Sequence, residues 1–373
     1  MIKELALKER EDYLATLKDL VNIETPSNDK VANDQMAEFL KDLLLKDGWD
    51  VELIEKSEVG NQVVASIGNA KPSTLILCHF DTVWPIGTLK TMPIIEKDGK
   101  VYGPGMMDMK AGITTAIHAL RIIKREGLKL KGAVTLLLSS DEEISSHHSK
   151  DLIIELAKEH EAVLVLEPSR GDGAVKVGRK GGGGFKVKFK GISAHAGNNP
   201  KDGASSIKEM AHFLLFAETL WNYDIGTTVT VNMVKGGFAN NVIPEYAEAH
   251  VDMRILQMGE EKRIEDAIRA YKPKDERVEI EVLGGLNRPP LEFNDKNKIL
   301  YAEFEKNAKK LGLEISSAIV GGGSDGNFTS AIGIPTLDGL GCVGVGPHAK
   351  HEHIVVDGTL ERLALLIAFL TEA

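Results

Sequence analysis

The sequence predicts an α/β protein: a mixed, mostly parallel sheet flanked by helices, with a smaller α+β domain inserted into it. Continuous apolar runs alternate with amphipathic helices over residues 1–177 and again over 288–373, a pattern typical of a sheet covered on both faces. Between them, residues 178–287 contain strands that alternate apolar and polar side chains, as in a half-exposed antiparallel sheet. Polar residues repeatedly follow the buried strands, and ligand sites of open α/β sheets lie at that edge.

The first segment has helical spacing of apolar residues in four places. The expected helices cover residues 3–22, 31–44, 112–124 and 152–156. The expected strands are short and apolar, and they cover residues 51–54, 62–67, 74–78, 133–138 and 162–166. After residue 288 the pattern of the first segment returns. The expected elements are helices over 296–311 and 360–370 and a glycine-rich loop at 321–326.

The inserted segment contains two consecutive β-α-β units. This order predicts a split βαβ, ferredoxin-like sandwich. Its expected elements are strands at 185–190, 227–234, 246–255 and 278–283 and helices at 207–221 and 261–271. Four glycines at 181–184 are interpreted as a hinge or the entry to a strand. The preceding cations Lys176, Arg179 and Lys180 are interpreted as a solvated part of that hinge rather than as an anion site.

Composition narrows the class of protein. A chain of 373 residues with 43% hydrophobic residues can support about two domains. The net charge of -10 argues against a nucleic-acid or anionic-membrane surface. No apolar run approaches the roughly 20 residues of a membrane span, and the charged N-terminus is unlike a signal peptide. With only Cys78 and Cys342, both in apolar or glycine-rich runs, a cytoplasmic protein with free thiols is expected.

A strand that ends in His79 and Asp81 suggests a metal ligand. Alternate side chains of an extended chain share a face, so an imidazole ligand and a carboxylate that orients it would project together. Asp108 lies between a Gly/Pro turn and the start of a helix. Each feature alone has an ordinary explanation, as a structural histidine or a simple turn. The case for a metal site therefore depends on residues later in the chain.

Five candidate ligands fall at strand ends or loops: His79, Asp108, Glu143, Glu167 and His348. Mixed nitrogen and carboxylate ligation suits a zinc-like dication, and a carboxylate can bridge two ions. Two ions about 3.5–4 Å apart can polarise a carbonyl and lower the pKa of a shared water. Glu142, adjacent to one of these ligands, is the natural proton shuttle. The joint placement favours a metal site over a solvated acidic turn.

The motifs together resemble those of the co-catalytic zinc exopeptidase family. They are HFD at 79–81, GPGMMDMKAG at 103–112, SDEE at 140–143, EP at 167–168, SAHAG at 193–197 and GPH at 346–348. That family includes glutamate carboxypeptidases of the carboxypeptidase G type, acetylornithine deacetylase, succinyl-diaminopimelate desuccinylase and aminoacylases. The resemblance covers nearly the whole chain and is closest to the glutamate carboxypeptidases.

The resemblance implies two zinc ions, for which Co²⁺ or Mn²⁺ can substitute. It implies that His79 and Glu167 bind one ion, that Glu143 and His348 bind the other, and that Asp108 bridges them. Asp81 would support His79, and Glu142 would be the general base. The family usually has a cis peptide after the bridging aspartate, here before Met109 rather than before a second acid.

The inserted domain would serve as a lid and as the dimerisation module of a homodimer. His195 would reach the partner's active site and donate to the oxyanion, although it could also be an ordinary surface-loop histidine. Asn241 and Arg288 would contact the substrate carboxylate, to which an arginine fork is suited. Gly323 and Ser324 would belong to a substrate loop, or else to a flexible turn.

We therefore expect a dizinc metallopeptidase that hydrolyses an amide next to a free carboxylate, such as that of a C-terminal glutamate. Its substrate would be a small peptide or an N-acyl amino acid, and neither nucleic acid nor a membrane would be a partner. One alternative is an N-acyl-amino-acid deacylase that uses the same ligands. Another, from a different class, is a non-catalytic binding protein on the same fold.

Overall fold

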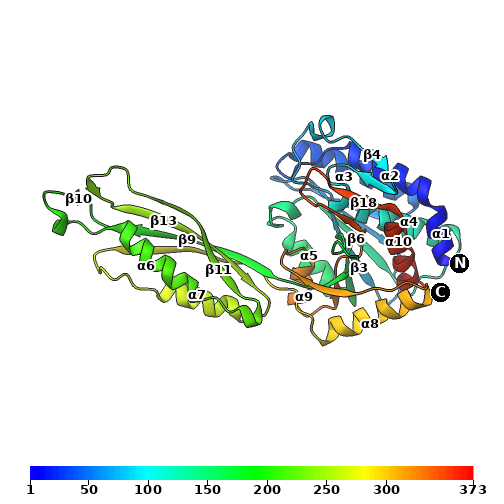
Figure 1. Cartoon of the computed structure of the whole chain (residues 1–373). Helices are drawn as coiled ribbons and strands as arrows, with labels where there is room; N and C mark the ends of the chain where they lie inside the picture. The colour runs from blue at the N-terminus through cyan, green and yellow to red at the C-terminus, as the bar shows by residue number, and fades with distance from the viewer. Residues whose placement is uncertain (373) are drawn as a thin grey trace. The chain divides into compact units, whose positions relative to one another are not determined.

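The computed structural model describes residues 1–372, which divide into two units (Figure 1). The second unit comprises Lys180–Pro290 together with Gly321–Gly323, and the first unit contains the rest of the described chain. From the sequence we expect the inserted domain to begin after residue 177 and to end at residue 287. The second unit is therefore an insertion into the first.

The first unit is built on a six-stranded sheet. In spatial order its strands are β1 (Asp50–Ile54), β2 (Gln62–Ile67), β6 (Val134–Ser139), β3 (Thr74–His79), β7 (Ala162–Val165) and β16 (Thr336–Leu337). The neighbours from β6 to β16 pair in parallel, whereas β1, β2 and β6 pair antiparallel. The predicted mixed, mostly parallel sheet is confirmed.

Both faces of this sheet are covered, which explains its continuous apolar runs. Along β3, Leu75 and Leu77 pack in a cluster with α5 (Lys150–Lys158) and α9 (Gly326–Ala331). Ile76 and Cys78 point the other way, into the larger core. Helices that contribute to the larger core are α1 (Ile2–Lys8), α2 (Arg10–Asn22), α3 (Lys30–Asp47), α4 (Ala111–Arg125), α8 (Asp295–Lys310) and α10 (Val356–Leu370).

Two smaller sheets complete the first unit and were not predicted. One has the order β17 (Gly344–Val345), β18 (His353–Val355), β5 (Lys100–Tyr102) and β4 (Ile95–Lys97). The other pairs β8 (Val175–Arg179) with β15 (Ser317–Val320) in parallel. Pairing of β18 with β5 brings the C-terminal part of the chain beside the turn that carries Asp108.

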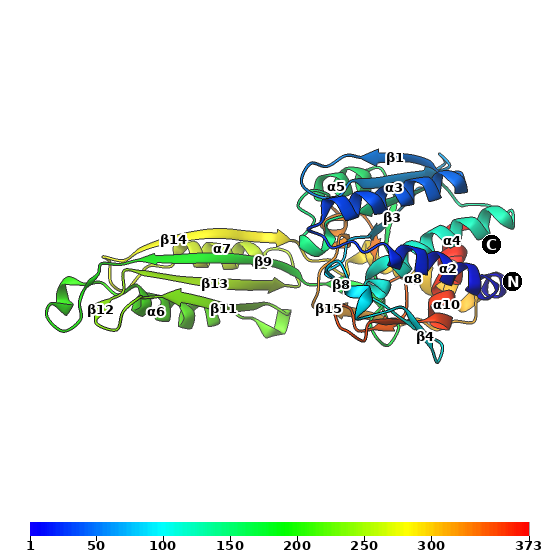
Figure 2. The ribbon, with the colours of Figure 1, turned by 90° about the horizontal axis from the view of Figure 1, so that it is seen from above.

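The second unit has the predicted split βαβ arrangement. Its elements in chain order are β9 (Gly181–Lys190), α6 (Ser206–Glu218), β11 (Thr228–Gly236), β13 (Tyr246–Ile255), α7 (Glu260–Ala270) and β14 (Glu279–Arg288). The strands pair antiparallel in the order β11-β13-β9-β14, and Figure 2 shows them side by side with the two helices behind. A short ladder joins β10 (Ala194–His195) to β12 (Val242–Ile243).

The four glycines at 181–184 form the first part of β9, paired on one side with β13 and on the other with β14. Of the two interpretations, hinge or strand entry, the structure shows the strand. A Cβ at Gly183 would lie 2.4 Å from the carbonyl oxygen of Gly285, so this position has no room for a side chain.

Within residues 1–372, none of the helices combines the length and the apolar character needed to cross a membrane.

Candidate active site

Three of the candidate ligands follow the central parallel strands of the first unit. His79 is the last residue of β3, and Glu143 lies in a single 3-10 turn, η3 (Glu142–Ile144), just beyond β6. Glu167 follows β7 by two residues. Because the carboxyl ends of parallel strands meet at one edge, these side chains converge there.

The other two candidates lie in segments that adjoin strands of the four-stranded sheet β17-β18-β5-β4. Asp108 lies in a turn, η2 (Met106–Lys110), between β5 and α4, and His348 lies between β17 and β18. The pairing of β5 with β18 holds the two segments together. The peptide bond between Asp108 and Met109 is cis, as the resemblance implied.

The carboxylate of Asp108 lies between two histidine–carboxylate pairs. Its Oδ1 is 3.2 Å from Nε2 of His79, and its Oδ2 is 3.3 Å from Nε2 of His348. The same nitrogen of His79 is 3.2 Å from Glu167 Oε1, and that of His348 is 3.1 Å from Glu143. The structure thus brings all five candidate ligands together as two pairs joined by one carboxylate.

The donor set fits a pair of zinc-like ions. Tetrahedral ligands about 2.0–2.1 Å from zinc lie roughly 3.3 Å from one another, which is close to the spacing of these nitrogen and oxygen atoms. Burial raises the pKa of Glu143, and the neighbouring charge of Asp108 raises it further although His348 opposes this. Buried carboxylates that crowd together in this way are stabilised when cations lie between them.

The orientation of His79 also suits a metal ligand. Its Nδ1 donates to the backbone carbonyl of Asp81 at 3.0 Å, so Nε2, which faces Asp108 and Glu167, is the nitrogen that would bind an ion. Such a bond on the second ring nitrogen is the usual partner of a metal-bound histidine. The ring is 1% exposed, so solvent does not compete for either nitrogen.

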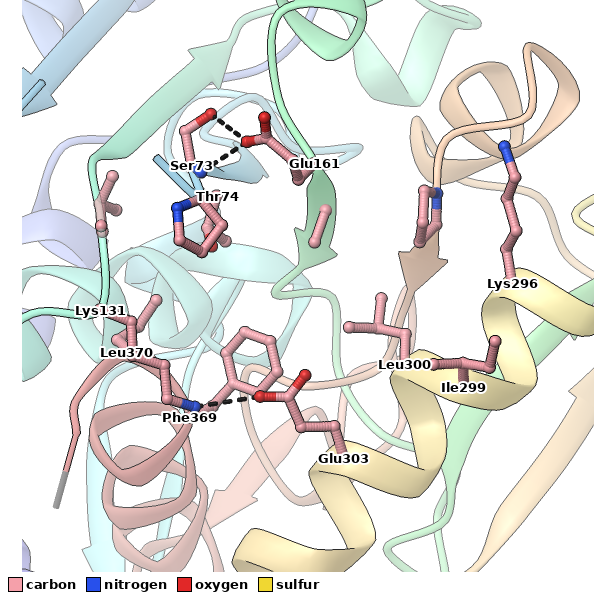
Figure 3. Close-up of a pocket in the computed structure, with 15 residues that line it drawn as sticks. Ser73, Thr74, Lys131, Glu161, Lys296, Ile299, Leu300, Glu303, Phe369 and Leu370 are labelled. Carbon is pink, nitrogen blue, oxygen red and sulfur yellow. Dashed lines mark hydrogen bonds and ion pairs between the residues drawn. The ribbon is translucent and has the colours of Figure 1, made fainter. Parts of the chain in front are cut away.

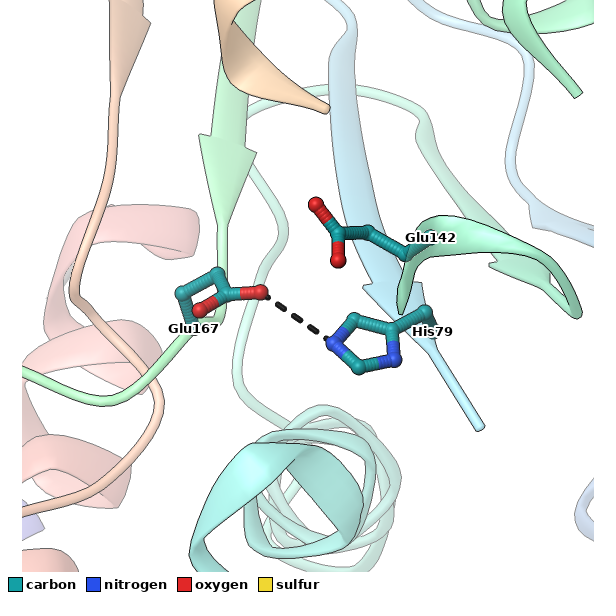
Figure 4. A group of neighbouring side chains, drawn as sticks. All are labelled: His79, Glu142 and Glu167. Atoms are coloured by element: carbon teal, nitrogen blue, oxygen red, sulfur yellow. Dashed lines mark ion pairs between the residues drawn. The ribbon is translucent and has the colours of Figure 1, made fainter. Parts of the chain in front are cut away.

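Glu142 lies beside the His79–Glu167 pair (Figure 4). One ligand atom from each of His79, Glu142 and Glu167 lies within 4.8 Å of the other two, as is also true of His79, Asp108 and Glu143. Figure 4 shows the carboxyl groups of Glu142 and Glu167 next to the same imidazole ring. A carboxylate in this place can accept a proton from a water bound between the pairs.

Asp81 connects the end of β3 to the turn that carries Glu142. Its carboxylate is fully buried and accepts the backbone N–H groups of Glu142 and Glu143 at 3.1 and 3.2 Å. Ser27 donates to the same carboxylate at 2.7 Å. Asp81 therefore fixes the backbone of the proposed base and one ligand besides lying against His79.

Glu352 is a site residue that sequence reasoning missed. Its buried carboxylate accepts the backbone N–H groups of Gly105, Met107 and Asp108 at 3.0, 2.8 and 3.2 Å, and the indole N–H of Trp84 at 2.9 Å. It therefore holds the turn that presents Asp108. In the sequence it is one polar residue between two histidines, and nothing there indicates what it contacts.

The interpretation of Arg179 as part of a solvated hinge was wrong. Arg179 is 3% exposed and forms ion pairs with Asp338 and Glu167. The backbone of Lys176 pairs with that of Asp338, N–H to O at 2.8 Å and O to N–H at 3.1 Å. Lys176 itself is only partly buried, and this burial lowers the pKa of its side chain. The reason is that β8 packs into the first unit instead of leaving it.

The substrate residues named from the sequence lie in both units. Ser324, in the first unit, is buried and donates to Asp338 while accepting the N–H of Gly326 at 3.2 Å. Arg288 and Gly323 adjoin in the second unit, where a Cβ on Gly323 would lie 2.8 Å from Arg288 Cδ.

His195 and Asn241 adjoin in the second unit as well. The backbone N–H of Ala196 donates to the carbonyl of Asn241 at 2.8 Å, and His195 pairs with Val242 in the short β10–β12 ladder. The imidazole of His195 is exposed. The two residues thus occupy one surface loop region of that unit.

A separate cavity of about 240 Å³ lies at the opposite edge of the first unit's sheet (Figure 3). Its walls include Thr74, Val134 and Ala162, which begin β3, β6 and β7. Lys131 in its wall pairs with Glu303 at 3.0 Å. The cavity contains none of the candidate ligands and is therefore distinct from the candidate active site.

Comparison with known proteins agrees with this geometry. A sequence profile of peptidase family M20/M25/M40 matches residues 75–372. The chain belongs to this family. It is therefore a metal-dependent hydrolase of the metallo-exopeptidase and amidohydrolase type, which leaves the non-catalytic alternative without support.

Individual relatives fit the family assignment. Carboxypeptidase G2 from Pseudomonas sp. (strain RS-16) is 30% identical, over 96% of this chain and 89% of the relative. Succinyl-diaminopimelate desuccinylase from Rickettsia canadensis (strain McKiel) is 29% identical, over 65% of this chain and 68% of the relative. The crystal structure of aminopeptidase PepT from Bacillus cereus ATCC 10987 matches with a TM-score of 0.83 at 21% identity, covering 97% of this chain and 98% of that chain. The last match confirms the fold.

Proposed function

We propose that this protein is a dizinc carboxypeptidase that removes a C-terminal glutamate, or a similar residue, from small peptides or N-acyl amino acids. The observation that carries the proposal is the 30% identity with carboxypeptidase G2 over 96% of the chain. We assign His79 and Glu167 to one ion, His348 and Glu143 to the other, and Asp108 to both. Co²⁺ or Mn²⁺ would suit the same donors.

The bound ions would supply Lewis acidity, which polarises the scissile carbonyl and makes a water easier to deprotonate. Glu142 takes the proton of the attacking water and then delivers it to the departing amine nitrogen. Asp81 keeps Glu142 in place through the backbone N–H bond at 3.1 Å. The chain's own contribution is therefore to orient the ligands and to move one proton.

We assign His195 to the stabilisation of negative charge on the substrate's carbonyl oxygen, in the active site of the second subunit. Nδ1 of His195 accepts the backbone N–H groups of Gly197 and Asn198, both at 3.1 Å. A nitrogen that accepts two hydrogen bonds carries no proton, so the neutral ring bears its proton on Nε2. That N–H is available as a donor to an oxyanion.

The preference for a free carboxylate is assigned to Arg288, with Asn241 as a further contact. The guanidinium of Arg288 belongs to a buried residue at the end of β14, and Gly323 leaves room for its side chain. An arginine held in this way is suited to a carboxylate. Gly323 and Ser324 would then form the loop beside the substrate.

We infer a homodimer formed through the second unit. Strand β11 is at the edge of its sheet, and its side chains Met233 and Val234 are 55% and 50% exposed. Leu215 on the adjacent helix α6 is 67% exposed. An uncovered edge strand with apolar neighbours is a ready site for pairing with a second copy. The buried free thiols of Cys78 and Cys342 are consistent with a cytoplasmic location, which stays a prediction.

A deacylase is the second candidate, favoured by the 29% identity with a succinyl-diaminopimelate desuccinylase over 65% of the chain. The same ligands and the same base would serve it, and only the groups that contact the acyl and amino acid parts would differ. The choice between the two functions therefore depends on the substrate.

Hydrolysis of a matched panel by zinc-loaded protein tests the proposal, with Glu142→Ala as the control. The panel sets N-acyl-glutamates and C-terminal glutamate dipeptides against N-acetylornithine and N-succinyl-diaminopimelate. We expect the glutamate compounds to be hydrolysed with the highest kcat/KM, and the activity to be lost in the variant. Preference for the other two compounds would move the assignment to the deacylases. Turnover that survives in Glu142→Ala would contradict the assigned base.

A further inference from the structure

Arg179, the last residue of β8, is a buried cation placed behind one of the proposed metal ligands. Its Nε and Nη2 donate to the two carboxylate oxygens of Asp338 at 2.6 and 2.9 Å. Nη2 is also 3.4 Å from Oε2 of Glu167. The other oxygen of Glu167, Oε1, faces His79 at 3.2 Å. The two oxygens of Glu167 thus face a guanidinium and the proposed metal position.

Asp338 is itself rigidly held, which fixes the guanidinium. It is fully buried, and its backbone pairs with that of Lys176 in both directions. Ser324 donates to its side chain. A planar guanidinium that pairs with both oxygens of a fixed carboxylate has little rotational freedom. Contacts within the protein therefore set the orientation of Arg179, and it does not depend on a bound metal ion or substrate.

The charge of Arg179 is retained despite its burial. Burial lowers the pKa of the guanidinium, but Asp338 and Glu167 outweigh it and raise that pKa. A permanent positive charge beside Oε2 draws that oxygen away from the metal position.

We propose that Arg179 is a positioning residue for metal binding, which presents Glu167 to the ion through a single oxygen. The inference rests on the proposed assignment of Glu167 as a ligand. Partners that orient a ligand in this way commonly change metal affinity or activity by about 10- to 100-fold when they are replaced. The rival interpretation is a direct contact of Arg179 with the substrate carboxylate.

The test is a zinc titration of metal-free protein in competition with a chromophoric chelator, in the absence of substrate. The variants are Arg179→Lys, which keeps the charge but not the fork, Arg179→Met and Asp338→Asn. Arg170→Met is the matched control, because Arg170 pairs with Asp172 in the same unit but is half exposed. Circular dichroism establishes that each variant is folded. If Arg179→Met does not fold, the other two variants carry the test.

We expect one of the two zinc affinities to fall about 10- to 100-fold in Arg179→Lys and Asp338→Asn, with the other unchanged. The control should bind zinc like the wild type. In a Glu167→Gln background the Arg179→Lys change should have no further effect, since coupled residues are not additive. Additive losses in that double variant would overturn the proposal.

Unchanged zinc affinities with a raised KM in the Arg179 variants would also overturn the proposal, in favour of a direct contact of Arg179 with the substrate. Failure of the wild-type protein to bind zinc at all is a distinct result, which would contradict the metal site itself and not only the role of Arg179.

Discussion

The carboxylate of Asp81 accepts the backbone N–H of Glu142 at 3.1 Å. This bond links the end of β3, which carries a proposed ligand, to the turn after β6, which carries the proposed base. Glu143, the residue next to the base, donates to the second oxygen of the same carboxylate at 3.2 Å. One buried side chain thus sets the relative positions of His79, Glu142 and Glu143.

Replacing Asp81 with asparagine tests this link. The amide can accept only through one oxygen, and its NH₂ group would face a backbone donor, so η3 should shift. We expect kcat/KM and zinc affinity to fall by about 10- to 100-fold. Ser27→Ala is the control, because it removes one donor to Asp81 and leaves the carboxylate in place. Equal activity of Asp81→Asn and Ser27→Ala would show that the hydrogen bonds between Asp81 and the backbone of η3 do not contribute to activity.

Glu352→Ala should destabilise the protein and weaken zinc binding together. The substitution removes the acceptor of the N–H groups of Gly105, Met107 and Asp108. Each buried donor left unpaired costs about 1–3 kcal/mol, and the turn that carries Asp108 loses its support. Thermal unfolding of metal-free protein and zinc titration measure the two effects.

Glu361→Ala provides the comparison for that experiment, since the Glu361 side chain on α10 is 40% exposed and pairs with Lys3 at the surface. A substitution of this kind usually changes stability by less than about 0.5 kcal/mol. If the Glu352 variant behaved like this one, the carboxylate would have no role in holding the turn.

His195→Gln should lower kcat by about 10²- to 10³-fold and leave zinc binding unchanged, since one donor to the oxyanion is lost. His250→Gln is the matched control, on β13 of the same unit. Mixing inactive Glu142→Ala with His195→Gln tests action across the dimer. Random exchange of equal amounts should restore roughly a quarter of the wild-type activity, because half of the dimers are mixed and each has one native site. No recovery after exchange would place His195 in the site of its own subunit or outside catalysis.

The cluster of the buried residues Glu9 and His118 with the half-exposed Arg125 predicts a pH-dependent contribution to the free energy of unfolding. His118 Nδ1 and Arg125 Nη2 each lie 2.9 Å from a carboxylate oxygen of Glu9. Burial raises the pKa of Glu9, but these two partners outweigh it and lower the pKa below its ordinary value of 4.5. The stabilisation is therefore present above about pH 4.5 and is lost as the pH falls below that value.

We expect Glu9→Gln to be less stable than the wild type by about 1.5–3 kcal/mol at neutral pH, as for hydrogen bonds to a charged group. The difference should shrink as the pH falls from about 5 towards 3. Urea unfolding at several pH values measures it. A difference that stays constant over this range would mean that the charge of Glu9 does not contribute.

Much of the fold could be predicted because its signals are local. Continuous apolar runs at β3 and β6 indicate a sheet buried on both faces, and strict alternation at β9 indicates an exposed one. The break between α1 and α2 was not predicted, since the apolar stripe continues across it and Glu9 turns inward only to meet partners more than 100 residues away. Strands such as β17 have two residues, and their pairing depends on distant segments.

The proposed ligands could be named from the sequence because each follows a strand or lies in a recognisable motif. Arg179 and Glu352 could not, because their roles depend entirely on tertiary contacts. Arg179 meets Asp338 across 159 positions, and Glu352 meets Met107 across 245. In the sequence Arg179 stands among other cations before a glycine run, where a solvated position is the ordinary expectation.

Zinc anomalous diffraction from crystals of the zinc-loaded protein shows directly whether Asp108 is shared by two metal ions. We expect two anomalous peaks about 3.5–4 Å apart, one against His79 and Glu167 and the other against His348 and Glu143, with Asp108 touching both. A single peak, or two peaks of which Asp108 contacts only one, would contradict the claim that this carboxylate is shared by two metal ions.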